Sequence, residues 1–341
     1  MNHMASLWLK PLMLLVACLF AVQAEAASKK PQQARKSVGK AVAHAKATPG
    51  RNPHIQRVAL RHPVSGQPAR GRRTMAPALP PPPEVFNPEL LEVFSTAALV
   101  INADDGAVVH EKNITAAAPI ASITKLMTAM VVLDAKLPLD EYIMLNEDDL
   151  DTVKGTGSRL QLGTMLTRDE MLRLALMSSE NRAASALGRS YPGGLAAFVR
   201  EMNLKALSLE MTRSSFVDST GLSAGNMASA LDLAKMVKAA YQYPLIRQYS
   251  TGNGYQVLAI NGRPLEFRNT NSLIVSPDWQ INLSKTGYIR EAGRCLVMHT
   301  TINNTPYVVV LLDSFGRMSR VGDANRIKKW IEYHFSSRTI G

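Results

Sequence analysis

Ser122 and Lys125 stand three residues apart at the start of an apolar, helix-forming segment. On a helix, residues at positions i and i+3 share one face, so this hydroxyl and this amine can meet. A serine hydroxyl is a weak nucleophile that needs an adjacent base. Burial and the positive end of a helix both lower the pKa of a lysine. The spacing predicts a nucleophile–base pair, although a helix-capping serine beside a solvated lysine fits the same two residues.

Two further motifs stand at the ends of expected elements. Residues 179–181 (Ser-Glu-Asn) follow an apolar helical segment that ends at Met177, and residues 285–287 (Lys-Thr-Gly) follow a strand-like run over residues 280–284. Each motif alone occurs by chance in many chains. Together, the order S-x-x-K, S-x-N, K-T-G is typical of serine acyl-transfer enzymes that recognise penicillin.

On these motifs the chain resembles the low-molecular-mass penicillin-binding proteins, which are D-alanyl-D-alanine peptidases related to serine β-lactamases. The resemblance extends over about residues 90–335 and includes residues 216–223, 269–271 and 292–295. It implies an α+β fold in which an antiparallel sheet has flanking helices and a helical subdomain. It also implies peptidoglycan stem peptides as partners and β-lactams as covalent inhibitors.

The same resemblance implies roles for the residues of the first two motifs. Ser122 would be the nucleophile that forms the acyl-enzyme, and Lys125 would be its general base. Ser179 would relay the proton to the leaving amine. Asn181 would orient Lys125 and the substrate amide.

The third motif would bind the substrate. Lys285 would supply positive charge for the substrate carboxylate and help to hold Ser179, while Thr286 would hydrogen-bond that carboxylate. Gly287 would let the substrate backbone lie against the strand edge. The backbone N–H groups of Ser122 and Tyr288 would hold the oxyanion.

The residues favour an endopeptidase over a carboxypeptidase. Residues 179–182 (Ser-Glu-Asn-Arg) are similar to the endopeptidase branch, and the chain stops at Gly341 without the extra domain of better-known carboxypeptidases. Glu180 and Arg182 could pair with the amine and carboxylate of a second stem's diamino acid, or simply point to solvent. A carboxypeptidase, or a non-hydrolytic penicillin-recognising module that binds the wall, are the alternatives.

The elements that must position these motifs form strand pairs at both ends of the domain, with helices between them. That order indicates an α+β domain with an antiparallel sheet. Thr167 is the expected cap of one helix, with Glu170 as its partner. The strands are expected at residues 97–102, 107–111, 256–260, 280–284, 294–301 and 307–313, and the helices from residue 122 and over residues 168–177, 229–241 and 323–335.

The first residues are typical of an export signal. Lys10 precedes an apolar run over residues 11–22, and small residues favour cleavage after Ala26. Residues 1–26 are therefore expected to direct the protein to the periplasm. Lipidation of Cys18 is a minor alternative.

Residues 27–86 differ sharply in composition from the rest of the chain. Between residues 28 and 83 there are 12 Lys and Arg and no acidic residue, which accounts for the formal net charge of +12. Such a Pro-rich basic segment predicts a disordered tether. It could associate electrostatically with anionic envelope polymers or serve as a solvated spacer. The expected export and the lack of interleaved aromatic residues argue against nucleic acid as a binding partner of this segment.

The catalytic domain is expected at residues 87–336, followed by a short tail over residues 337–341. Cys295 lies in an expected strand, where a buried free thiol is the default. The seven histidines show no metal-ligand spacing and no H-E-x-x-H motif is present, so neither a metal nor a cofactor is expected.

Overall fold

The computed structural model describes residues 89–316 and 318–335. Within this part of the chain, no helix combines the length and apolar character needed to cross a bilayer. Four expected features lie outside the described residues: the signal segment 1–26, Cys18 within it, the tether 27–86 and the tail 337–341.

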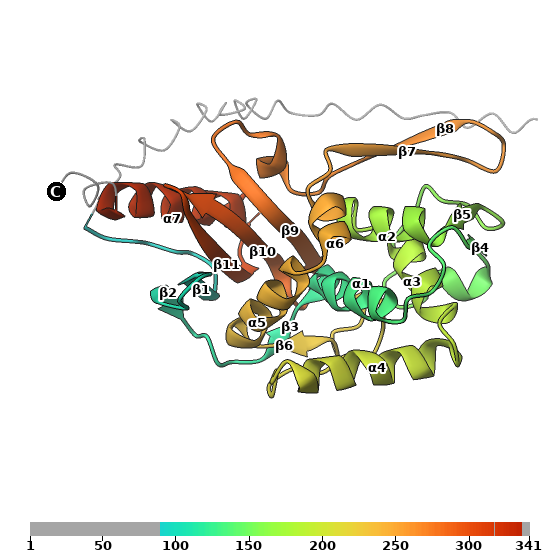
Figure 1. Ribbon diagram of the computed structural model, residues 1–341, viewed down its shortest axis with the longest axis horizontal. Helices are drawn as coiled ribbons and strands as arrows, with labels where there is room; N and C mark the ends of the chain where they lie inside the picture. The colour runs from blue at the N-terminus through green and yellow to red at the C-terminus, as the bar shows by residue number, and fades with distance from the viewer. Residues whose placement is uncertain (1–88, 317, 336–341) are drawn as a thin grey trace, which may run out of the picture. The chain divides into compact units, whose positions relative to one another are not determined.

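Five strands of the described chain form one antiparallel sheet in the order β2-β1-β11-β10-β9 (Figure 1). Val308 and Val310 of β11 point to one face of this sheet, and Val309 points to the other, yet all three are fully buried. A sheet covered on both faces requires this pattern. The strands are β1 (Ala97–Asn102), β2 (Val108–Lys112), β9 (Gln280–Ile289), β10 (Gly293–Ile302) and β11 (Thr305–Ser314).

Helices cover both faces of the sheet. Helix α7 (Ser319–Phe335) buries Ala324, Ile327 and Ile331 against one face. Helix α5 (Ala230–Tyr241) packs on the other face. The expected α+β fold, with an antiparallel sheet and flanking helices, is confirmed.

The remaining described helices build a helical subdomain around the apolar helix α1, and short strand pairs connect them. The helices are α1 (Thr124–Asp134), α2 (Arg168–Met177), α3 (Asn181–Arg189), α4 (Gly194–Ser208) and α6 (Pro244–Ser250), with 3₁₀ turns η1 (Ala121–Ile123), η2 (Glu147–Asp149) and η3 (Ser272–Val275). The pairs are β3 (Ala118–Pro119) with β6 (Met227–Ala228), β4 (Tyr142–Met144) with β5 (Met165–Thr167), and β7 (Gly254–Leu258) with β8 (Pro264–Arg268).

Two local predictions are confirmed in detail. The Thr167 hydroxyl accepts a hydrogen bond from the backbone N–H of Glu170, and the Glu170 carboxylate accepts one from the N–H of Thr167 at 2.8 Å. This reciprocal capping box fixes the start of α2, which ends at Met177, two residues before Ser179 of the second motif. Cys295 is fully buried in β10 as a free thiol, and burial raises its pKa to about 11.

Two element boundaries were predicted wrongly, and both matter for the site. Residues 285–287 lie inside β9 rather than after it, because pairing with β10 carries the strand on to Ile289. Lysine and glycine are weak strand formers, so local propensity ended the strand too early. Helix α7 begins at Ser319, four residues before the expected start at Asp323. Two smaller shifts place β2 one residue later and β7 two residues earlier than expected.

Candidate active site

Ser122 lies on η1, the single 3₁₀ turn that leads into α1, and not within an α-helix as predicted. Lys125 is the second residue of α1, and its amine still reaches the hydroxyl of Ser122. Ala121 has a φ of +49°, the left-handed region that costs energy for any residue with a Cβ. Something must therefore hold this turn in place.

Two glycines from distant parts of the sequence pack closely against this turn. A Cβ added to Gly221 would lie 2.0 Å from the carbonyl oxygen of Ala121, and one added to Gly287 would lie 2.8 Å from that of Ile120. Neither position has room for a side chain. From the sequence, the absence of a side chain at Gly287 was expected to make room for the substrate backbone. In the structure, it also allows β9 to pack against the turn that carries Ser122.

Lys125 is fully buried, and its amine has three partners. The Nζ atom lies 2.9 Å from Ser122 Oγ, 2.8 Å from Asn181 Oδ1 and 2.6 Å from the Thr220 carbonyl oxygen. The Asn181 and Thr220 oxygens can only accept hydrogen bonds. When Lys125 is neutral, its two N–H groups serve these oxygens and its lone pair faces the hydroxyl of Ser122. This is the geometry of a general base and its nucleophile.

The surroundings of Lys125 also favour that neutral form near neutral pH. Burial is the main cause that lowers its pKa, to about 7, while the charges of Asp218 and Glu180 act in the opposite direction. Roughly equal amounts of amine and ammonium at pH 7 suit a group that must accept and return a proton.

The second and third motifs meet at Ser179 and Lys285. Lys285 Nζ donates to Ser179 Oγ at 2.8 Å and to the carbonyl oxygen of Thr286 at 2.9 Å. Burial, followed by the charges of Lys125 and Arg320, holds the pKa of Lys285 well below its usual range. The expected positive charge on Lys285 is therefore disfavoured in the free protein, a point that its sequence context does not reveal.

Strand β9 presents its outer edge beside the nucleophile. It is a terminal strand of the sheet and pairs only with β10 among the described strands. The hydroxyls of Thr286 and Thr270 are 2.6 Å apart, and Tyr288 remains 56% exposed with Arg294 over its ring. An unpaired strand edge can receive an extended peptide.

Two further residues contribute to the site without belonging to any of the three motifs. Arg320, in the first turn of α7, donates to the carbonyl oxygen of Gly287 at 3.4 Å, and it was missed because the helix start was placed too late. Asp218 accepts from the N–H groups of Thr220 at 2.7 Å and Gly221 at 2.6 Å, so it holds the loop that supplies the Thr220 carbonyl. An aspartate two residues before Thr-Gly is a signal for such an Asx turn.

Glu180 and Arg182 both lie at the start of α3, beside Asn181. The Glu180 carboxylate, 9% exposed, accepts from the backbone N–H of Arg182 at the start of α3. The Arg182 guanidinium donates to the carbonyl oxygen of Leu160. Both side chains make hydrogen bonds within the protein, so neither extends freely into solvent.

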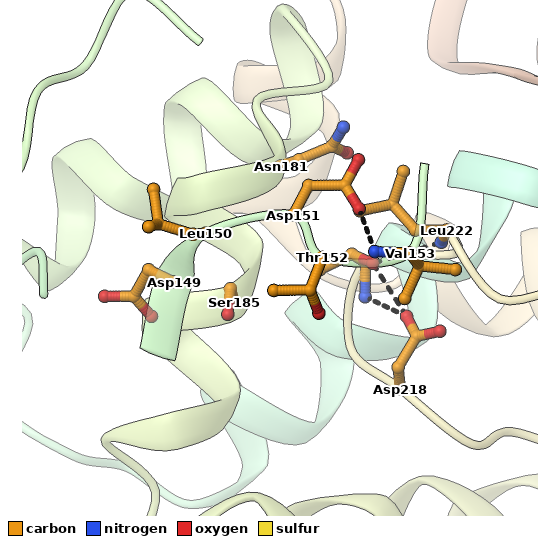
Figure 2. Close-up of a pocket in the computed structure, with 10 residues that line it drawn as sticks. Asp149, Leu150, Asp151, Thr152, Val153, Asn181, Ser185, Asp218 and Leu222 are labelled. Carbon is orange, nitrogen blue, oxygen red and sulfur yellow. Dashed lines mark hydrogen bonds between the residues drawn. The ribbon is translucent and has the colours of Figure 1, made fainter. Parts of the chain in front are cut away.

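A pocket opens beside Asn181 and Thr220, the two residues that bind Lys125 (Figure 2). Asp151 and Asp218 face it from two separate loops. Among the described residues, no group of three or more His, Cys, Asp or Glu is arranged to hold a metal ion.

Comparisons with known proteins agree with this geometry. A family profile described as D-alanyl-D-alanine carboxypeptidase matches residues 84–316. A D-alanyl-D-alanine endopeptidase of Pseudomonas aeruginosa is 47% identical over 253 residues, which cover 74% of this chain and 82% of that protein. One of Escherichia coli is 47% identical over 244 residues, covering 71% and 78%. The crystal structure of a Streptomyces DD-transpeptidase matches with a TM-score of 0.65 at 25% identity, covering 70% of this chain and 97% of that one.

Proposed function

The chain belongs to the D-alanyl-D-alanine carboxypeptidase family and is a serine-type D-alanyl-D-alanine peptidase, and from that premise we propose that it hydrolyses peptidoglycan cross-links as an endopeptidase. The observation that carries the peptidase activity is the contact of the fully buried Lys125, through Nζ, with Ser122 Oγ at 2.9 Å. β-Lactams are the inhibitors that this class of site implies, because they acylate the same nucleophile.

The reaction begins with attack of Ser122 Oγ on the carbonyl carbon of a D-alanyl residue, while the Oγ proton moves to Lys125 Nζ. The backbone N–H groups of Ser122 and Tyr288 stabilise the oxyanion. When the C–N bond breaks, the proton that Lys125 accepted passes by way of Ser179, which is held by Lys285, to the departing amine, and Lys125 is neutral again. Water then attacks the ester on Ser122 while Lys125 accepts a proton from it, and that proton returns to Ser122 Oγ as the ester bond breaks.

The substrate lies along the free edge of β9. Thr286 binds the carboxylate of the leaving residue, and Arg320 contributes the permanent positive charge that burial disfavours on Lys285. Asn181 keeps one amide N–H for the substrate's acyl chain. Gly287 has no side chain to obstruct the peptide.

Two relatives support the endopeptidase over the carboxypeptidase. The Pseudomonas and Escherichia proteins at 47% identity are both named D-alanyl-D-alanine endopeptidase. Relatives named D-alanyl-D-alanine carboxypeptidase are more distant, for example 30% identical over 246 residues in Bacillus subtilis. The acyl-enzyme is common to both reactions, so the difference lies in which leaving amine the cleft accepts.

We further propose that the protein works in the periplasm after removal of residues 1–26. The basic residues 27–86 would then associate with anionic polymers of the envelope. The support is the apolar run behind Lys10 and the excess of 12 Lys and Arg over residues 28–83.

The deciding experiment is digestion of purified cross-linked muropeptide dimers and of monomeric pentapeptides side by side, followed by mass spectrometry. We expect dimers to be converted to monomers while pentapeptides stay largely intact. Loss of terminal D-alanine from pentapeptides with intact dimers would identify a carboxypeptidase. Persistence of an unhydrolysed acyl-enzyme would identify a binding module.

Fluorescent penicillin supplies the control for this experiment. The label should appear on the peptide that contains Ser122 and vanish in Ser122→Ala. Labelling that survives in Ser122→Ala would contradict the assignment of the nucleophile, whichever bond is cut.

A further inference from the structure

Residues 151–156, here called the Asp151 loop, fold around one carboxylate. Asp151 Oδ1 accepts from the N–H groups of Val153 at 2.9 Å and Lys154 at 2.8 Å. Its Oδ2 accepts from the N–H of Thr156 at 2.8 Å and from the Thr156 hydroxyl at 2.6 Å. Partial burial would raise the pKa of Asp151, but these hydrogen bonds outweigh it and lower that pKa. The carboxylate is therefore ionised at neutral pH and can only accept hydrogen bonds.

The Asp151 loop reaches the catalytic machinery through Thr156. Asn181 Nδ2 donates to Thr156 Oγ1 at 3.0 Å. Asp151 and Asn181 line the same pocket, and both are labelled in Figure 2. Since the Thr156 proton is committed to Asp151, its oxygen can only accept from Asn181. The side-chain amide nitrogen of Asn181, and not its oxygen, must therefore face the Asp151 loop.

This constraint passes on to Lys125. With its Nδ2 turned to Thr156, Asn181 presents Oδ1 to Lys125 Nζ at 2.8 Å. The Thr220 carbonyl oxygen is the second acceptor, at 2.6 Å. Two N–H groups of the neutral amine are thereby fixed, so the lone pair remains for the hydroxyl of Ser122. A flipped Asn181 would offer N–H groups to Lys125 and draw the lone pair away from Ser122.

The Asp151 loop is also tied to the sheet. Lys154 Nζ lies 2.5 Å from a carboxylate oxygen of Glu291, in the turn between β9 and β10. Hydrogen bonds to Asn181 at the start of α3 and to Glu291 after β9 hold the loop from both the helical and the sheet side of the site.

We propose that Thr156, held by Asp151, is a positioning residue that fixes the orientation of the Asn181 amide and so directs the lone pair of Lys125 at Ser122. The inference deepens the proposed function and rests on its assignment of Ser122 and Lys125. Thr156 acts through Asn181 and need not touch the substrate.

The test compares Thr156→Val, which keeps the shape and removes the hydroxyl, with Thr156→Ser, which keeps the hydroxyl. The second-order rate of acylation by fluorescent penicillin is measured on the full-length chain over a pH series. Thr156→Val should acylate roughly ten- to thirtyfold more slowly, because a misdirected general base loses part of its contribution to the rate. Thr156→Ser should stay within about twofold of wild type. Thr212→Val, at an exposed loop position outside the cleft, is the matched control and should be unchanged.

The pH profile separates positioning from a merely structural role. The charged groups that face Lys125, which are Asp218, Glu180 and Lys285, are the same in every variant. A flipped Asn181 disfavours the ammonium form, so the acid limb in Thr156→Val should move to lower pH. A slower rate with an unmoved acid limb, or an unchanged rate, would overturn the inference. If wild type is not acylated at Ser122, the proposed function itself fails, which is a distinct result.

Discussion

The two buried lysines of the site, Lys125 on α1 and Lys285 on β9, have the same chemistry but different surroundings. They are 0% and 1% exposed, and burial lowers the pKa of both. The charges that shift the pKa of Lys125 are carboxylates, those of Asp218 and Glu180, which limit the fall caused by burial to about 7. The charges nearest Lys285 are cations, which push its pKa down further.

The comparison shows that burial alone does not make a general base. A lysine exchanges a proton most efficiently during turnover when its pKa lies near the working pH. Opposing carboxylates bring Lys125 into that range. Lys285 lacks them, and its geometry suits it to hold Ser179 in place.

The largest effect should come from removing Lys125. Lys125→Ala removes the base, and acylation by fluorescent penicillin should fall by roughly 10²- to 10⁴-fold. Lys205→Ala, which removes a partly buried lysine that pairs with Asp134 on the helical subdomain, should leave the rate unchanged. A Lys125→Ala protein that keeps its fold and acylates within tenfold of wild type would contradict the assignment of Lys125 as the general base.

A smaller loss is expected from Lys285→Ala. This change removes the hydrogen bond to Ser179, and loss of one bond of this kind should slow acylation by roughly ten- to hundredfold. The measurement is the same penicillin assay, run at matched protein stability. If Lys285→Ala proves more damaging than Lys125→Ala, the roles of the two lysines must be exchanged.

The smallest effect should come from Glu180→Gln, which keeps the helix cap and removes the charge. The Glu180 carboxylate stabilises the ammonium form of Lys125, so its removal should lower the pKa of Lys125 further. Wild-type acylation should rise with pH to a plateau with a midpoint near pH 7, and the midpoint should lie lower in Glu180→Gln.

At about pH 6, below that midpoint, Glu180→Gln should therefore acylate about two- to threefold faster than wild type. Glu201→Gln on α4, a carboxylate outside the site, is the matched control. A midpoint that stays in place, or moves to higher pH, would show that Glu180 does not tune the base.

The sequence was informative about the site where function depends on side-chain identity. Ser122, Lys125, Asn181 and the pair Ser179–Lys285 were predicted from three motifs, and the structure brings each into hydrogen-bond contact as expected. The motifs carry this information because each requires a particular functional group at a particular spacing. The antiparallel sheet followed from the order of strand-like and helix-like segments.

The parts that escaped prediction depend on the backbone or on distant pairing. The Thr220 group that binds Lys125 is a backbone carbonyl, which every residue type has, so the identity of residue 220 does not predict this contact. Thr156 reaches Asn181 only because its loop folds on Asp151. The true length of β9 is set by its partner β10 and not by its own residues.

The close packing of Gly221 and Gly287 against the turn that carries Ser122 has a consequence for how the chain folds. The three segments that meet there are far apart in sequence, and contacts with such long separations require large loops to close. In an incompletely folded chain, Ser122 and Lys125 are still only three residues apart. However, the turn that carries Ser122 is not held in place, and the amine of Lys125 is not buried. Ser122 and Lys125 therefore become a reactive pair only after these long-range contacts have formed.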